Sequence, residues 1–306
     1  MSRAVIHESF GGPEVLEIHE IQEPHAAEGE VRIKVSAAGL NPIDWGLSSK
    51  PDLAERFGYS IPSGFGHDFA GVIDEVGDNV EGFHLGDRVY GGALGKAVAD
   101  FVVIKPSTGT LTHTPDAISD EVATTLPIAG LTAVAALDAI NVKSGDTLLV
   151  GGACGGVGVF VVQLAKLAGA VVIGTCSKHN FEFLEQLGAL PVQYGPGLAD
   201  RVKILAPDGI SAATDLFGTE TVEAALDLGV APDRISTIAA GPNPPGGVRS
   251  TGGGQAQPGS LERITDAIIE GKLTVPITAR FPLEKIRDAV TLQSGRHVRG
   301  KIVITL

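Results

Sequence analysis

The clearest pattern of hydrophobic and polar positions lies in residues 147–177. The apolar run Thr147–Val150 predicts a buried strand, and a glycine-rich segment follows it. Apolar residues then recur at helical spacing until Gly169, and Val171–Cys176 predicts a second buried strand. Strand, glycine loop, helix and strand within about 30 residues are typical of a dinucleotide-binding unit.

Residues 1–110 follow a different pattern, in which short apolar or alternating segments are separated by Gly-rich and Pro-rich turns. Val31–Val35 alternates apolar and polar side chains, as a half-buried strand does. Strands are expected at Ala4–His7, Leu16–Glu20, Glu30–Ala38, Gly71–Val76, Arg88–Tyr90 and Phe101–Ile104. The segment therefore looks all-β, and the regular strand spacing suggests a small barrel.

From Ser119 onward helical and strand patterns alternate. Helices are expected at Thr132–Ile140, Asn180–Leu187, Leu198–Leu205, Thr221–Leu228 and Leu261–Glu270, and further strands at Pro191–Tyr194, Ala212–Leu216 and Arg234–Ala239. This alternation predicts an α/β fold with a doubly wound parallel sheet, a Rossmann domain. Residues 241–260 are rich in Gly and Pro and form the least structured part.

The end of the chain returns to β-like segments at Pro276–Arg280 and Gly300–Leu306. We expect these segments to rejoin the first domain and make it discontinuous. The predicted division is a β-barrel domain at 1–120, completed by 275–306, and a dinucleotide-binding domain at 121–274.

The glycine loop is an imperfect G-x-G-x-x-G motif, because alanine stands where the first glycine would be. The predicted pyrophosphate-binding residues are Ala153, Gly155, Gly156, Val157 and Gly158. Their glycines let the backbone approach a phosphate, and the start of the following helix offers unpaired N–H groups. The alternative is a glycine-rich turn without a ligand.

The residues after the second strand indicate which cofactor binds. An acidic residue there would hold the adenosine ribose of NAD, but no acid occurs before Glu182. Ser177 and Lys178 are instead suited to a 2′-phosphate, by hydrogen bonding and by charge. The sequence therefore favours NADPH over NADH, unless Lys178 is only a solvated charge.

Composition narrows the class of protein further. The 306 residues carry a net charge of −13, which disfavours nucleic acid and anionic membrane surfaces as partners. Two cysteines exclude a disulfide framework and a four-cysteine zinc lobe. The N-terminus lacks the apolar core of a signal peptide, and no apolar stretch is long enough to span a membrane. A cytoplasmic protein is expected.

The two cysteines, Cys154 and Cys176, fall in the glycine loop and at the end of the neighbouring strand. They are either small buried fillers or a pair whose oxidation would block NADPH binding.

Several longer motifs occur in a specific order: AAGLNPIDW at 37–45, GHDFAGVIDEVG at 66–77, GDRVYG at 86–91, LPIAGLTA at 126–133, GGVGVFVVQLAKLAGA at 155–170, LGA at 187–189 and HVRGKIVITL at 297–306. Together they resemble the medium-chain dehydrogenase/reductases, in the zinc-independent, zeta-crystallin-like quinone oxidoreductase branch. The resemblance implies a GroES-like barrel domain, a Rossmann domain, a cleft between them and often a homodimer. The stretch expected to pair in a dimer, 248–254, is glycine-rich and a poor strand former.

Zinc-dependent alcohol dehydrogenases of the same superfamily bind catalytic zinc through two Cys and one His. At the matching positions this sequence has Asn41, His67 and Ile128. Amide and isoleucine side chains are poor zinc ligands, so no metal site is expected. His67 is expected to be a hydrogen-bonded residue of the cleft wall.

The resemblance also implies roles for individual residues. Asn41 would lie near the nicotinamide, and Asp44 would be either catalytic or structural. Pro42 stands where the branch often has tyrosine, so no tyrosine acid is available there. Thr132 would contact the nicotinamide ribose and the substrate, or cap its helix, or both.

The remaining implied contacts are with the cofactor. Ser177, Lys178 and Tyr194 would surround the 2′-phosphate. Arg299 and Lys301 would be C-terminal cofactor contacts, or ordinary charges on a strand edge.

The expected function is hydride transfer from NADPH to a quinone or an α,β-unsaturated carbonyl without zinc. The alternatives are an enoyl-thioester reductase and a non-catalytic, crystallin-like NADPH-binding protein.

Overall fold

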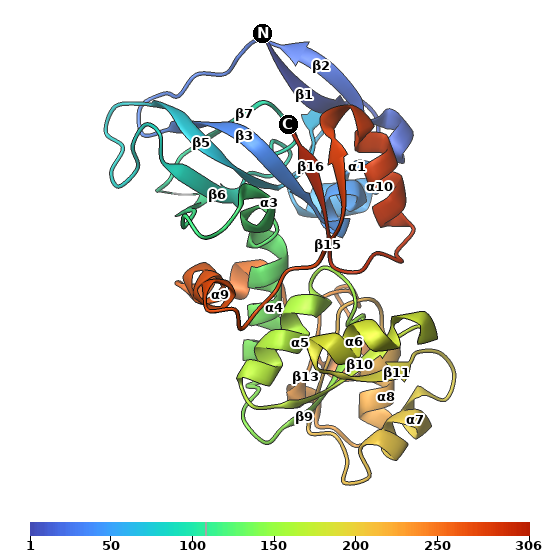
Figure 1. Cartoon of the computed structure of the whole chain (residues 1–306). Helices are drawn as coiled ribbons and strands as arrows, with labels where there is room; N and C mark the ends of the chain where they lie inside the picture. Colours follow the sequence, from blue (N-terminus) through green and yellow to red (C-terminus); the bar gives the residue numbers. More distant parts are fainter. Residues whose placement is uncertain (108) are drawn as a thin grey trace. The chain divides into compact units, whose positions relative to one another are not determined.

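The computed structural model describes residues 1–107 and 109–306 (Figure 1). The chain forms two compact units, Met1–Ile128 with Ile277–Leu306, and Ala129–Pro276. The first unit extends beyond the expected boundary at residue 120. The reason is that the short helix α3 (Asp120–Ala123) packs on strands β3 (Val31–Leu40) and β5 (Asp68–Val76) of that unit.

The second unit contains a six-stranded sheet in the order β11-β10-β9-β12-β13-β14, with every pairing parallel. Its strands are β9 (Thr147–Gly151), β10 (Val171–Cys176), β11 (Leu190–Gln193), β12 (Ala212–Asp215), β13 (Ile235–Thr237) and β14 (Arg249–Ser250). Its helices are α4 (Pro127–Ala139, beginning at the unit boundary), α5 (Gly158–Leu167), α6 (Phe181–Leu187), α7 (Leu198–Leu205), α8 (Glu220–Asp227) and α9 (Ser260–Ile269). The predicted Rossmann architecture is confirmed.

The pattern of buried positions explains why these strands form the centre of the unit. In β9 and β12 nearly every side chain is buried, because helices cover a parallel sheet on both faces. Leu149, Ile173, Ala213 and Ile235 from four neighbouring strands pack in one core with Val222 of α8. In the stretch 241–260 the only strand the structure describes is the two-residue edge strand β14, so this stretch is indeed poor in strand structure.

The first unit consists of two sheets whose strands pair mostly antiparallel. One sheet has the order β2-β1-β4, and the other has the order β15-β16-β3-β5-β6-β8, with β7 also pairing with β3. The additional strands are β1 (Ser2–His7), β2 (Glu17–Ile21), β4 (Ser63–Gly64), β6 (Arg88–Gly92), β7 (Phe101–Ile104), β8 (Thr110–His113), β15 (Ile277–Pro282) and β16 (Lys301–Thr305). Within the second sheet, only β15 and β16 run parallel.

The C-terminal strand completes this unit. Figure 1 shows β16, in red, beside β3, in blue, and Ile302 lies opposite Leu40 in the register of the pair. The last segments thus lie in the same unit as residues 1–128, and the end of β3 comes next to the start of β16.

The expectation that residues 1–110 are all-β is wrong. Helices α1 (Pro42–Ser49) and α2 (Pro51–Arg56) lie within them, and α10 (Ile286–Ser294) in the C-terminal segment was also missed. The start of α1 carries a recognisable signal, because Pro42 stands at the first helical position and the Asp44 carboxyl accepts the N–H of Asn41, as in one half of a capping box. Short 3-10 helices occupy Pro13–Val15, Lys178–Asn180, Pro232–Arg234, Pro245–Gly247, Gly253–Gln255 and Leu283–Lys285.

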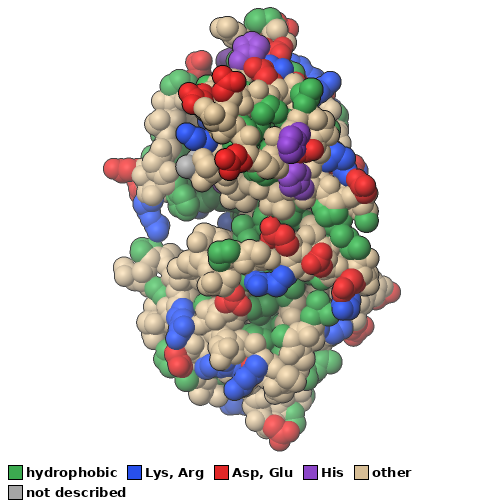
Figure 2. All heavy atoms as spheres, turned by 90° about the vertical axis from the view of Figure 1, so that its left-hand side faces the viewer, with side chains coloured by type: hydrophobic (Ala, Val, Ile, Leu, Met, Phe, Trp, Pro, Cys, Tyr) green, Lys and Arg blue, Asp and Glu red, His purple; other side chains and the backbone are tan. Residues whose placement is uncertain are grey.

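The surface mixes charges of both signs. On the face drawn in Figure 2, acidic and basic side chains are interspersed, whereas nucleic-acid binding uses a clustered basic stripe. Among the residues that the structure describes, no helix combines the length and apolarity needed to cross a bilayer.

Candidate active site

The glycine loop lies at the point where the strand order of the parallel sheet reverses. β9 has β10 on one side and β12 on the other, and this switch point is where such sheets bind nucleotides. Gly152 has a φ of +69°, and its carbonyl accepts a hydrogen bond from the N–H of Gly155. A Cβ on Gly158 would lie 2.4 Å from the Gly152 carbonyl oxygen, so only glycine permits this path into α5. The residues present therefore form a backbone cradle that fits a pyrophosphate.

The candidate 2′-phosphate residues come from the ends of two neighbouring strands. Ser177 and Lys178 follow β10, Tyr194 follows β11, and these strands pair in parallel. The N–H of Tyr194 donates to the Cys176 carbonyl at 3.4 Å, which holds the two strand ends together. Lys178 is exposed, and Tyr194 is 46% exposed. The structure thus gathers the three predicted residues at one edge of the sheet.

His179, which lies beside Ser177, was not among the site residues predicted from the sequence. His179 Nε2 lies 3.3 Å from Ser177 Oγ, which also accepts a hydrogen bond from Asn180 Nδ2. The sequence offered a signal, because His179 directly follows the two predicted phosphate ligands and a histidine adds a donor or a charge.

Thr132 lies on α4 in the second unit. The suggestion that it caps this helix is wrong, because α4 begins at Pro127 and Thr132 falls in its interior. The residue is 8% exposed, and a Cβ on Gly253 would lie 3.3 Å from its hydroxyl oxygen. Thr132 therefore packs against the segment around Gly253.

The first unit contains a buried polar cluster, which we call the Asn41 cluster: Asn41, Asp44, Asp68 and Lys301. Asn41 Nδ2 donates to Asp68 Oδ2 at 2.8 Å, and Lys301 Nζ donates to Asn41 Oδ1 at 2.6 Å. The N–H of Asn41 donates to Asp44 Oδ2 at 2.7 Å. All four residues are at most 4% exposed. The Asn41 amide is therefore fixed at its nitrogen by the Asp68 carboxyl and at its oxygen by the Lys301 ammonium.

Strand pairing brings this cluster together. Gly39, near the end of β3, lies opposite Asp68 at the start of β5, and Leu40 lies opposite Ile302, which follows Lys301 in β16. Lys301 Nζ also donates to the Leu40 carbonyl at 3.1 Å. Residues about 260 positions apart in sequence thus share one small volume.

Burial controls the charges of the Asn41 cluster. It raises the pKa of Asp44 to about 8, and the nearby Asp68 adds to that rise. Burial also raises the pKa of Asp68, and the positive charge of Lys301 opposes that rise. Burial lowers the pKa of Lys301, and the negative charges of Asp68 and Asp44 oppose that fall. With one ammonium facing two carboxyls, Asp44 holds its proton at neutral pH.

These contacts change how two predicted residues are interpreted. Asn41 was expected near the nicotinamide and Lys301 as a C-terminal cofactor contact, and in the structure the two residues are hydrogen-bonded to each other. Asp68 was missed, although it directly follows His67 in the quoted GHDFAG motif. Arg299 is exposed, and its carbonyl accepts a hydrogen bond from the Thr278 hydroxyl.

The residues at the zinc-ligand positions of alcohol dehydrogenases lie near one another. The Ile128 N–H donates to Asp68 at 3.2 Å, beside Asn41, and His67 Nε2 lies against Gly92. The expectation that His67 is hydrogen-bonded is not met at its Nδ1, which is buried without a partner among the described residues. Within that described part, no three His, Cys, Asp or Glu side chains are arranged as ligands of one metal ion.

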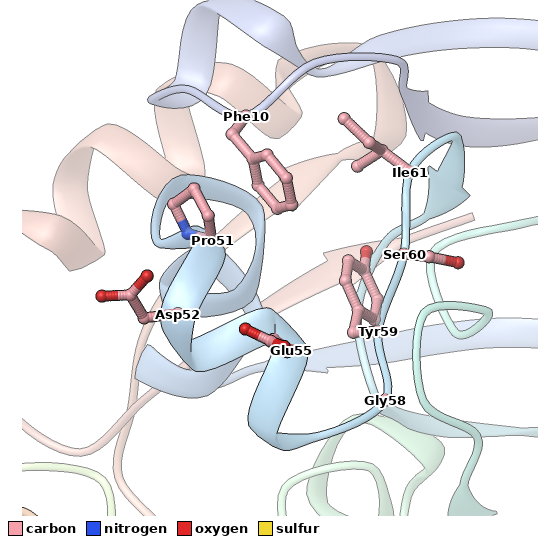
Figure 3. A pocket seen from close by; sticks show the side chains of 8 residues that line it. All are labelled: Phe10, Pro51, Asp52, Glu55, Gly58, Tyr59, Ser60 and Ile61. Carbon is pink, nitrogen blue, oxygen red and sulfur yellow. The ribbon is translucent and has the colours of Figure 1, made fainter.

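A separate open pocket of about 570 Å³ lies on the first unit (Figure 3). Phe10, Tyr59 and Ile61 give it apolar walls, and Asp52 and Glu55 add two carboxylates. Two carboxylates repel a phosphate, and none of the predicted site residues lines this pocket. The pocket therefore does not match the expected cofactor chemistry.

The parallel sheet with its glycine cradle, in one chain with the antiparallel barrel unit, defines a two-domain dehydrogenase/reductase. Residues 27–113 match the family described as alcohol dehydrogenase GroES-like domain, and residues 187–304 match the family described as zinc-binding dehydrogenase. The chain belongs to the quinone oxidoreductases of the medium-chain dehydrogenase/reductase family.

Individual relatives agree with that assignment. A chloroplast envelope quinone oxidoreductase homolog of Arabidopsis thaliana is 31% identical, covering 99% of this chain and 98% of the relative. An NADPH-dependent alkenal/one oxidoreductase of the same plant is 28% identical, covering 99% and 79%. The solved quinone oxidoreductase of Coxiella burnetii is 31% identical with a TM-score of 0.88, covering 100% and 99%.

Proposed function

We propose that this protein is an NADPH-dependent oxidoreductase that transfers hydride to a quinone or an α,β-unsaturated carbonyl without zinc. The observation that carries the proposal is the glycine cradle at the switch point of the sheet, next to Ser177 and Lys178 rather than an acid. The names of relatives, a quinone oxidoreductase homolog and an NADPH-dependent alkenal/one oxidoreductase, support the substrate classes.

In this proposal the backbone of Ala153, Gly155, Gly156, Val157 and Gly158 binds the pyrophosphate. Ser177, Lys178 and Tyr194 bind the 2′-phosphate, and Arg299 and Thr132 make further cofactor contacts. NADPH supplies the hydride, so the protein's contribution is to bind, orient and exclude water.

The role proposed for the Asn41 cluster is to hold the end of β3 and the start of α1 in place. Both ends of the Asn41 amide are engaged, by Asp68 and Lys301, and Asp44 caps α1 through the Asn41 N–H. We therefore favour the structural alternative for Asp44 and treat Asn41 and Lys301 as positioning residues. The absence of thiolates at the positions of Asn41 and Ile128 supports a reaction without zinc.

The Lys178→Ala substitution tests the cofactor assignment. Removing one charged contact to a phosphate should raise the KM for NADPH by about 10- to 100-fold and leave the KM for NADH unchanged. Lys203→Ala is the matched control, since Lys203 is an exposed lysine on α7 of the same unit. Equal effects on NADPH and NADH would contradict the 2′-phosphate role.

Substrate turnover tests the reaction itself. Steady NADPH consumption with 9,10-phenanthrenequinone or an enal is the expected result. NADPH binding without turnover of any quinone, enal or enoyl thioester would indicate a crystallin-like binding protein, and preference for the thioester would indicate an enoyl-thioester reductase.

A further inference from the structure

The two cysteines of the chain lie side by side at the carboxyl ends of adjacent strands. β9 and β10 pair in parallel with Val150 opposite Gly174. Cys176 ends β10, and Cys154 lies in the glycine loop that follows β9. The two thiols are not joined by a disulfide, and the Cys154 thiol donates a hydrogen bond to the sulfur of Cys176. The pair therefore joins the glycine loop to the strand that precedes Ser177.

Small residues hold the loop against β10 and keep the cysteines close. A Cβ on Gly174 would lie 2.8 Å from the Cβ of Ala153, so glycine at 174 is what lets the loop approach. The N–H of Gly152 donates to Thr175 Oγ1 at 3.1 Å and ties the same segments together. The packing of these backbone segments thus places the two cysteines close together.

The environment of the pair favours reaction with a small oxidant. The hydrogen bond from Cys154 lowers the pKa of Cys176, against the effect of burial, and the thiolate is the reactive form of cysteine. Cys154 is 8% exposed and Cys176 is 4% exposed. A molecule the size of hydrogen peroxide suits such narrow access better than a bulky disulfide reagent.

We propose that peroxide converts Cys154 and Cys176 into a reversible disulfide that weakens NADPH binding. The Cys176 thiolate attacks one peroxide oxygen, the O–O bond breaks, and the departing hydroxide takes a proton to leave as water. The Cys154 sulfur then attacks the sulfenic sulfur, the S–O bond breaks, and a second water leaves. Two thiols lose two hydrogens while one peroxide is reduced to two waters. The consequence for NADPH rests on the proposed function.

The bridge changes the cofactor site because it needs sulfurs about 2.05 Å apart, much closer than hydrogen-bonded thiols. Cys154 must move toward β10 and take Gly155 and Gly156 with it. Ser177, next to Cys176, is displaced from the other side. Both the pyrophosphate cradle and the residues proposed for the 2′-phosphate lose their alignment.

The experiment compares the full-length protein before and after hydrogen peroxide. Intact mass should fall by two hydrogens, and thiols titrated in denaturant should fall from two to none. The Kd for NADPH, measured by its fluorescence, should rise at least about tenfold, since phosphate-binding N–H donors are lost, and dithiothreitol should restore it.

Cys154→Ser and Cys176→Ser are the matched variants, because each retains one thiol and cannot form the bridge. Both should bind NADPH after peroxide treatment as tightly as before it, without any reduction step. The proposal is overturned if the wild-type mass shows no loss of two hydrogens, if the bridge forms without changing the Kd, or if either variant loses affinity as the wild type does. If the reduced wild type does not bind NADPH, the proposed function fails, while the mass and thiol measurements still decide whether the bridge forms.

Discussion

Replacement of Asp44 by asparagine should remove a pH dependence of stability that the Asn41 cluster creates. Asp44 is 4% exposed; its Oδ2 accepts the N–H of Asn41, and its Oδ1 is buried without a hydrogen-bond partner among the described residues. Asparagine keeps the acceptor that caps α1 but has no proton to lose. Asp44→Asn therefore isolates the cost of ionising this carboxyl.

The magnitude follows from the shift in pKa. The pKa of Asp44 is about 8 in the folded protein, against an ordinary value of 3.8, and each unit corresponds to about 1.4 kcal/mol. The folded state keeps the proton longer than the unfolded state, so the stability that Asp44 contributes is fully present below about pH 4. It is lost as the pH rises to about 8, by a total on the order of 6 kcal/mol.

Asp68 and Lys301 change the dependence of stability on pH in opposite directions. Asp68, whose pKa burial also raises, adds to the loss as the pH rises. Lys301, whose pKa burial lowers, makes a contribution of the opposite sign in the alkaline range. Because the three groups interact, the variant should flatten the curve between pH 5 and 8 without making it level.

Urea unfolding followed by circular dichroism at pH 5, 6, 7 and 8 measures this effect. The wild type should lose stability steadily across the series, so the advantage of Asp44→Asn over it should grow at each step from pH 5 to pH 8. Asp44→Ala is the control: it also lacks the titrating carboxyl, so its curve should run parallel to that of Asp44→Asn and lie about 1 kcal/mol below it through loss of the cap. An Asp44→Asn curve parallel to that of the wild type would refute the reasoning.

Two further perturbations test the remaining geometry. Lys301→Met should lower the free energy of unfolding by about 3–5 kcal/mol, because it leaves the buried Asp68 without a compensating charge. Adding Asp68→Asn should recover part of that loss. No recovery in the double variant would show that the two charges are not coupled. Gly158→Ala should weaken NADPH binding by at least about tenfold, because its Cβ would lie 2.4 Å from the Gly152 carbonyl oxygen and shift the cradle. Gly218→Ala, where a Cβ meets nothing within 4 Å, is the control, and equal affinities for both variants would contradict the cradle.

Much of the second unit was determined by the sequence alone, because its signals are local. Helix α7 lies at the expected Leu198–Leu205, and β10 at the expected Val171–Cys176. Buried parallel strands read as continuous apolar runs, and the covering helices repeat at their own period. These patterns need no knowledge of distant residues.

The first unit depended more on tertiary structure. The motif containing Asn41, Pro42 and Asp44 held the signal for α1, yet the β pattern of the neighbouring segments obscured it. No local sequence pattern predicts that the residues of the Asn41 cluster meet. They come together only because strand β3 pairs with β5 and with β16. Their charges likewise depend on burial, and burial is a property of the packed chain.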